Sequence, residues 1–168
     1  MEAEYRDLHA VVESYEKYDE DSRLSADNIR RLEFLTALVC MNKYLEKGNS
    51  ILDVAAGTGA YALYYAALGM QVTALDITPS YIEILKNKAA NQHLQITSFV
   101  NDARDLSMFS DNSFDCVFCM GPIYHLPNPE DREKVMRESL RVLKPGGLFY
   151  LAYINKHFIF ALLASQNK

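Results

Sequence analysis

After Gly48, short apolar runs alternate along the chain with segments of helical periodicity. Such alternation is typical of strands joined by crossover helices, which build a parallel sheet covered by helices on both faces. We therefore expect an α/β fold with a doubly wound, mostly parallel sheet. In such sheets ligands bind beyond the carboxyl ends of the strands, where the strand order reverses. The expected strands are Ile51–Ala55, Val72–Leu75, Ile96–Val100, Phe114–Met120 and Leu148–Ile154.

The helices expected between these strands carry signals at their ends. Thr78 before Pro79, and Asn128 before Pro129, each predict an N-cap followed by proline in the first helical turn. The Lys-Pro-Gly-Gly segment at 144–147 predicts the end of the last helix and a loop before the final strand. The expected helices are Ala60–Leu68, Pro79 to about Ala90, and Pro129 to about Lys144.

Residues 1–48 are polar, with apolar residues at helical spacing. Ile29, Leu32, Leu35 and Val39 predict one apolar stripe of a helix. Ser25 is the expected N-cap, and Gly48 the expected stop. We interpret residues 1–48 as a helical cap that belongs to the same domain as residues 49–168.

Charge and cysteine content narrow the class of protein. The 168 residues fit one domain, with 17 Lys and Arg against 22 Asp and Glu, a net charge of −5. An acidic surface argues against nonspecific binding to nucleic acid or to an anionic membrane. Three cysteines cannot all pair, and the N-terminus lacks the basic start and apolar run of a signal peptide. We therefore expect a cytoplasmic protein without a membrane span.

Chemically suggestive residues follow the first three expected strands. Gly57 and Gly59 come after the first strand. Glycines let a ligand approach the backbone closely, and the free N–H groups at the start of the following helix can donate to a negatively charged group. Asp76 ends the second strand 19 residues after Gly57, the spacing at which a carboxylate accepts from both ribose hydroxyls. Asp102, with the backbone N–H of Ala103, follows the third strand and is suited to reading adenine. Together these positions predict an adenosine site, although each alone fits an ordinary turn or loop acid.

A nicotinamide-dependent oxidoreductase is an alternative, because Gly57, Gly59 and Ala62 together with Asp76 also fit a dinucleotide fingerprint. Asp53, four residues before the first glycine, and the Lys-Pro-Gly-Gly segment before the last strand argue against that alternative.

Five segments together resemble class I S-adenosylmethionine-dependent methyltransferases. They are ILDVAAGTG, TALDITP, VNDARDL, FDCVFCMGPIYHL and ESLRVLKPGGLFY, in the same order as in that family, and they cover residues 50–154. The N-terminal YEKYDEDSRL and RRLEFLT resemble the helical cap of a bacterial branch that acts on small molecules. The resemblance implies that residues 49–168 bind S-adenosyl-L-methionine and release S-adenosyl-L-homocysteine.

The resemblance also implies roles for individual residues. The turn from Ala55 to Gly59 would lie against the methionine part of the cofactor. Asp76, followed by Ile77, would hold the ribose, and the pair Asp102 and Ala103 would read the adenine. Met120 and Gly121 would line the cofactor beside the acceptor. We expect Asp53 to fix the glycine turn by accepting backbone N–H bonds. Tyr15, Tyr18 and Arg23 would fold over the cofactor, where Arg23 either pairs with its carboxylate or is an ordinary exposed arginine.

Methyl transfer from a sulfonium is an in-line displacement, so alignment of donor and acceptor is the main requirement. Tyr124 and His125 follow the fourth strand on the acceptor side, and His125 could take a proton from the acceptor or simply pack within the loop. Gly121-Pro122 differs from the Asn/Asp-Pro-Pro-aromatic loop of enzymes that methylate amide or adenine nitrogens. We therefore expect a small-molecule acceptor and no nucleic acid.

Cys116 and Cys119 lie three apart in an expected strand, so their side chains should point to opposite faces. We interpret both as core residues and expect no metal site.

The chain departs from the family pattern at two places. Ala55 replaces the first turn glycine, and residues 155–168 are too few for the last helix and the antiparallel strand pair. We therefore expect a form that is truncated after the fifth strand, and a catalytically inactive cofactor-binding remnant remains an alternative. A bare strand edge invites pairing, so we expect a fifth strand that is exposed, covered by the C-terminal tail, or paired in a homodimer through this edge or the tail. We interpret the apolar run Phe158–Leu163 as helix or core.

Overall fold

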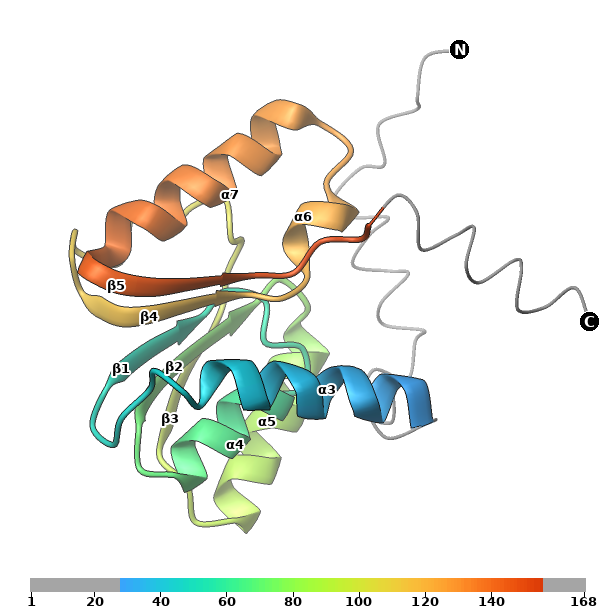
Figure 1. Ribbon diagram of the computed structural model, residues 1–168, viewed down its shortest axis with the longest axis vertical. Coiled ribbons are helices and arrows are strands. Elements are labelled where there is room, and N and C mark those ends of the chain that lie inside the picture. The colour runs from blue at the N-terminus through green and yellow to red at the C-terminus, as the bar shows by residue number, and fades with distance from the viewer. Residues whose placement is uncertain (1–27, 156–168) are drawn as a thin grey trace, which may run out of the picture.

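The computed structural model describes residues 28–155, with side chains from residue 31 onward. Its centre is a five-stranded sheet in the order β3-β2-β1-β4-β5 (Figure 1), and every neighbouring pair is parallel. The α/β fold expected from the alternating pattern is confirmed. The elements are α3 Asn28–Met41, β1 Ser50–Asp53, α4 Ala60–Ala67, β2 Gln71–Asp76, α5 Pro79–Asn91, β3 Ile96–Val100, β4 Phe114–Cys119, α6 Pro122–His125, α7 Pro129–Val142 and β5 Leu143–Leu151.

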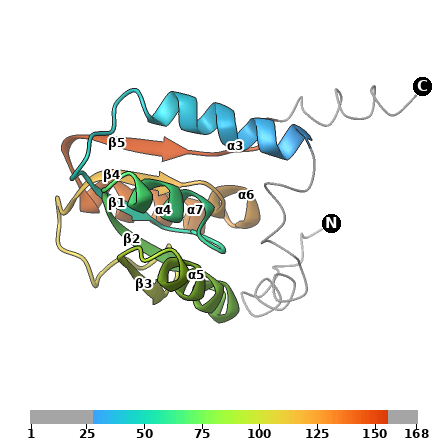
Figure 2. The ribbon, with the colours of Figure 1, turned by 90° about the horizontal axis from the view of Figure 1, so that it is seen from below.

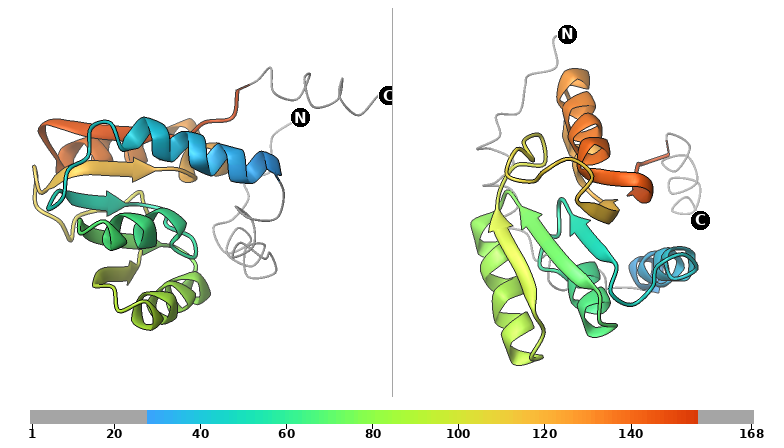
Figure 3. Two further views of the ribbon diagram at one scale, coloured as in Figure 1. Left: turned by 60° about the horizontal axis from the view of Figure 1, so that its bottom comes forward. Right: turned by 90° about the vertical axis from the view of Figure 1, so that its left-hand side faces the viewer.

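Helices cover both faces of the sheet (Figures 2 and 3), with α3, α4 and α5 on one side and α7 on the other. The chain runs outward from β1 to β3 and then returns to place β4 against the other side of β1. The strand order therefore reverses between β1 and β4, which is where ligands bind in sheets of this kind.

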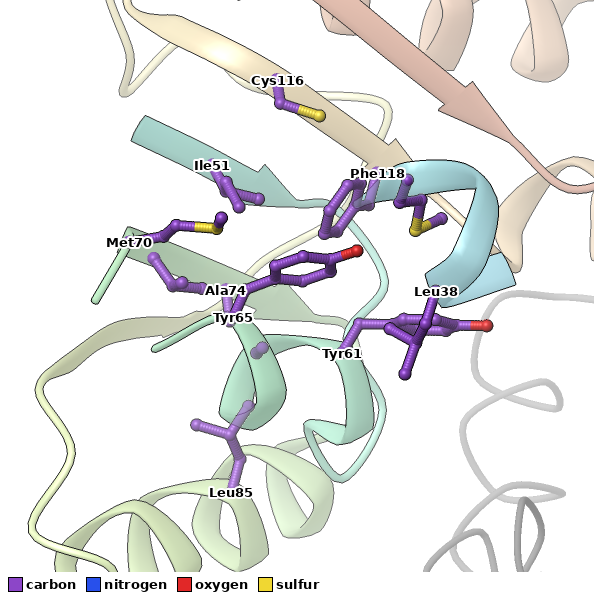
Figure 4. Close-up of a cluster of buried hydrophobic side chains, with 12 residues drawn as sticks. Leu38, Ile51, Tyr61, Tyr65, Met70, Ala74, Leu85, Cys116 and Phe118 are labelled. Atoms are coloured by element: carbon purple, nitrogen blue, oxygen red, sulfur yellow. The ribbon is translucent and has the colours of Figure 1, made fainter. Parts of the chain in front are cut away.

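Each face of the sheet has its own apolar cluster. Tyr65 of α4 packs in one cluster with Ile51, Cys116 and Phe118 of the sheet (Figure 4). Its ring centroid lies 5.2 Å from that of Phe118. Cys119 belongs to the cluster beneath α7 instead. The two cysteines thus lie on opposite faces, as expected, and burial raises the pKa of the Cys119 thiol to about 12.

The face of α3 that packs against the core differs from the expected one. Leu32, Leu35 and Val39 are 64%, 48% and 63% exposed. A second set at helical spacing is buried instead: Leu38 and Met41 lie in the core, and Phe34 and Ala37 pack against it. Because both sets satisfy helical periodicity, only tertiary packing decides between them. The helix ends at Met41, so Gly48, with φ of +92°, forms the turn into β1 rather than the helix stop.

The start of β5 is a second correction. Lys144-Pro145-Gly146-Gly147 lie within β5, which begins directly after α7, and not in a loop. A shift in the register between β4 and β5 accommodates them. A Cβ atom on Gly147 would lie 2.9 Å from the carbonyl oxygens of Asp115 and Lys144, so the backbone itself requires glycine there. The strand ends at Leu151 rather than Ile154.

Several expectations lie outside the described residues. They concern Tyr15, Tyr18, Arg23, Ser25 and the run Phe158–Leu163. Within residues 28–155, every helix is too short or too polar to cross a lipid bilayer.

Candidate functional site

The loops that follow β1 and β3 are hydrogen-bonded to β2 at the carboxyl end of the sheet. The Ala56 N–H donates to the carbonyl of Leu75 (2.9 Å), which links the loop after β1 to β2. The Asn101 N–H donates to the carbonyl of Asp76 (3.0 Å), which links the loop after β3 to β2. The positions expected to form an adenosine site therefore follow strands that are bonded to each other.

Asp76 holds the glycine turn. Its Oδ2 accepts the backbone N–H of Gly57 at 2.8 Å, and its Oδ1 accepts the N–H of Thr78 at 2.9 Å. Hydrogen bonds from the Thr78 side chain and the Ile77 N–H also reach this carboxylate, so a ligand diol would share or displace part of this set. The side chain is 9% exposed, and burial raises its pKa, although these N–H bonds oppose the shift.

Gly57 and Gly59 adopt positive φ values of 54° and 90°. A Cβ atom on Gly59 would lie 2.7 Å from Leu85 of α5, so this turn needs glycine both for its conformation and for packing. Helix α4 begins at Ala60, directly after the turn. Its N-cap residue, Gly59, provides no side-chain cap for the first N–H groups of the helix.

Asp53 interacts with the glycine turn more weakly than expected. We expected its carboxylate to accept N–H bonds from this turn; the Ala55 N–H is near enough to lower its pKa, but neither oxygen forms a well-aligned hydrogen bond among the described residues. The side chain is 1% exposed. Burial raises its pKa to about 7; the nearby Ala55 N–H opposes this shift and the charge of Asp76 adds to it. A buried carboxylate without a partner is costly, so it is suited to receive a cationic group.

The loop after β3 contains an ion-pair network that sequence reasoning missed. The guanidinium of Arg104 binds Asp102 through Nη2 to Oδ2 (2.6 Å) and reaches Asp131 of α7 through Nη1 to Oδ2 (2.9 Å). All three side chains are mostly buried. Ala103, the expected adenine contact beside Asp102, is 8% exposed.

The segment after β4 forms the short helix α6, where we expected a loop. A Cβ atom on Gly121 would lie 3.8 Å from the Cβ of Ala55 and 4.0 Å from the hydroxyl of Tyr124, so the turns after β1 and β4 are adjacent. The Tyr124 hydroxyl donates to the carbonyl of Met120 (3.1 Å), and its ring lies 4.5 Å from that of His125. Both aromatic side chains are exposed at this end of the sheet.

The structure thus brings most of the expected site residues to the carboxyl end of the sheet. Ile77, between Asp76 and Thr78, is partly buried there. The carboxylates suit a diol, an amino group and an ammonium group, and the exposed rings of α6 suit an organic acceptor. The role of each residue in binding stays a prediction.

Comparisons with known proteins agree with this arrangement. A family model described as a methyltransferase domain matches residues 52–151. Ubiquinone biosynthesis O-methyltransferases of Xanthomonas oryzae pv. oryzae and Xanthomonas campestris pv. campestris are each 32% identical over 133 residues, which is 79% of this chain and 52% of theirs. The chain therefore spans about half the length of these curated relatives.

Solved structures show the same likeness. A SAM-dependent methyltransferase from Methanosarcina mazei superposes with a TM-score of 0.68 at 30% identity, over 75% of this chain and 62% of that one. A protein from Pyrococcus horikoshii has a TM-score of 0.68 at 29% identity, over 82% of this chain and 63% of that one.

Proposed function

This chain belongs to the methyltransferase-domain family, and on that premise we propose that it transfers a methyl group from S-adenosyl-L-methionine to a small-molecule acceptor. The observation that carries the proposal is the pairing of Asp76 with Gly57 at the carboxyl end of the sheet, beside the point where the strand order reverses between β1 and β4. This pairing places a buried carboxylate next to a turn of backbone N–H groups. A nucleoside that is linked to a charged amino acid needs both.

The residues present fit this cofactor. The buried Asp53 carboxyl is the test: its oxygens make no well-aligned hydrogen bond among the described residues, and a positively charged neighbour would stabilise its charged form. Asp53 would bind the ammonium group, Asp76 the ribose hydroxyls, and Asp102 with the Ala103 N–H the adenine. Met120 and Gly121 would line the cofactor beside the acceptor. When bound, S-adenosyl-L-methionine supplies a methyl group that its positive sulfur has already activated.

The acceptor side lies at α6. Tyr124 and His125 would contact the acceptor, and His125 would take a proton from an acceptor that arrives as a neutral hydroxyl. The name of the curated relatives, which are O-methyltransferases, supports an oxygen acceptor. The departing proton and the incoming methyl group balance the charge on that oxygen.

A binding experiment and a turnover experiment test the proposal. Calorimetry with the full chain should show binding of S-adenosyl-L-homocysteine and none of NADH; binding of NADH alone would overturn the assignment. The family match favours the methyltransferase over the oxidoreductase.

Methyl transfer to a panel of small phenols, followed by mass spectrometry, should show a product with one added methyl group. Binding without any turnover would favour the inactive remnant.

We also propose that the chain acts in the cytoplasm as a homodimer that pairs through the edge of β5. Its three cysteines suit a reducing compartment. Among the described residues β5 has β4 as its only neighbour, so its outer backbone groups are open to pairing.

A further inference from the structure

One arginine joins the loop after β3 to the first turn of α7. Arg104 contacts Asp102, two residues before it, and Asp131, 27 residues after it. Asp102 follows the strand that borders β2, whereas α7 leads into β5 at the other edge of the sheet. The guanidinium therefore fixes the Asp102 carboxylate against a separate element of the fold.

Arg104 leaves Asp102 with little spare hydrogen-bonding capacity. Its backbone N–H donates to Oδ1 at 2.9 Å, and its Nη2 donates to Oδ2 at 2.6 Å. Its Nε–H is shared between the two oxygens, at 3.1 Å and 2.9 Å. Three donors thus occupy about three of the roughly four acceptor positions of the carboxylate. About one position remains, in an orientation that the planar, forked guanidinium holds fixed.

We propose that Arg104 is a positioning residue that acts through Asp102 and gives this site its preference for a 6-aminopurine over a 6-oxopurine. The inference rests on the proposed function, because it assumes that Asp102 meets the base. A single fixed acceptor position matches one N–H of a 6-amino group. A 6-oxo group would bring another acceptor oxygen to the same place, where it would repel the carboxylate and find no N–H to accept.

Asp131 is the second part of this arrangement. It accepts from Arg104 Nη1 at 2.9 Å, and Lys134 Nζ lies 3.5 Å from its other oxygen. Without Asp131, Arg104 would keep its contacts with Asp102 but lose its attachment to α7. The Asp131→Asn variant should therefore weaken the base preference less than loss of Arg104 does.

The test compares two ligands by calorimetry on the full chain. S-adenosyl-L-homocysteine carries the 6-amino group, and S-inosyl-L-homocysteine carries oxygen in its place. The unmodified chain should bind the adenosyl ligand at least tenfold more tightly. In Arg104→Met, adenosyl affinity should fall at least tenfold while inosyl affinity changes less than threefold, so the preference collapses. Arg104→Lys should restore only part of it, because one ammonium cannot replace the fork.

The matched control is Arg137→Met on α7, whose side chain is 63% exposed and contacts Glu133 at 3.8 Å. It should leave both affinities unchanged. Equal loss of both ligands in Arg104→Met, or an intact preference, would overturn the inference. If that variant fails to fold, Asp131→Asn decides: a preference reduced about threefold supports the inference, and an unchanged one overturns it. Failure of the unmodified chain to bind either ligand would instead overturn the proposed function.

Discussion

The Asp76 carboxylate accepts the backbone N–H of Gly57 at 2.8 Å, across 19 residues of sequence. The acid at the end of β2 thus holds the turn after β1. Asp76 has a structural role before any ligand binds, and we propose that it also binds the ribose diol. Binding and stability are therefore coupled at this residue.

Replacement of Asp76 should separate these two roles. Asp76→Ala should weaken S-adenosyl-L-homocysteine binding at least tenfold, about 1.4 kcal/mol. It should also lower the free energy of unfolding by about 1–3 kcal/mol, because it leaves the N–H groups of Gly57 and Thr78 without their acceptor. Asp76→Asn retains one acceptor oxygen and should keep more of the stability than of the affinity. Calorimetry and urea unfolding measure the two effects; unchanged affinity in both variants would refute the ribose assignment.

The pKa of Asp53, raised by burial to about 7 from 3.8, predicts a pH-dependent stability. Between these values the folded chain retains a proton that the unfolded chain has lost. The contribution of Asp53 to stability is therefore fully present below about pH 4 and is lost as the pH rises through about 7. The raised pKa of Asp76 acts in the same direction. Urea midpoints from pH 5 to 8 should decline less steeply in Asp53→Asn than in the unmodified chain, and equal slopes would contradict the prediction.

Asp53 should also link cofactor binding to proton release. An ammonium group stabilises the charged carboxylate, so binding should lower the pKa of Asp53 and release a proton near pH 6. Calorimetry of S-adenosyl-L-homocysteine at that pH, in two buffers with different ionisation enthalpies, measures this proton directly. Affinity should rise between pH 6 and 8, and Asp53→Asn should abolish much of the release. Equal proton release in the variant would place the ammonium elsewhere.

Much of the fold could be predicted from local patterns. The bounds of β3 agree with the expected Ile96–Val100, and Pro129 begins α7 with the Asn128 side chain accepting the N–H of Glu130. Thr78 is the N-cap residue of α5, as expected, but its side chain makes no capping bond. These features depend on a few neighbouring residues, which is why the sequence reveals them.

The features that the sequence did not reveal depend on distant partners. The buried face of α3 is set by packing of Phe34 against Tyr61, with ring centroids 4.9 Å apart. The extension of β5 through Gly147 depends on its register with β4. Arg104 could not be linked to Asp131 from sequence, because only the fold brings α7 to the loop after β3. The lack of a well-aligned hydrogen bond to Asp53 could not be predicted either, because it depends on where the folded turn places its N–H groups.

Gly48 and Gly59 have almost equal φ values, so substitutions at these two positions distinguish the cost of backbone strain from the cost of overpacking. Gly59 has φ of +90° and would meet Leu85 at 2.7 Å, whereas Gly48 has φ of +92° and nothing within 4 Å of an added Cβ. Gly48→Ala should cost about 1–2 kcal/mol of unfolding free energy from the left-handed conformation. Gly59→Ala should cost about 1–3 kcal/mol more, because overpacking adds to the strain. Equal costs in urea unfolding would show that Leu85 moves away freely.

The edge of β5 should mediate self-association. Tyr153 and Ile154, which follow this strand, are 71% and 58% exposed. Sedimentation equilibrium should detect a dimer at micromolar concentration. The double variant Tyr153→Lys with Ile154→Lys should shift the chain to monomer, because charges beside an open edge oppose pairing. Leu68→Lys, at an exposed apolar residue that follows α4, should leave the dimer intact. A monomeric unmodified chain at that concentration would show that the open edge alone does not drive pairing.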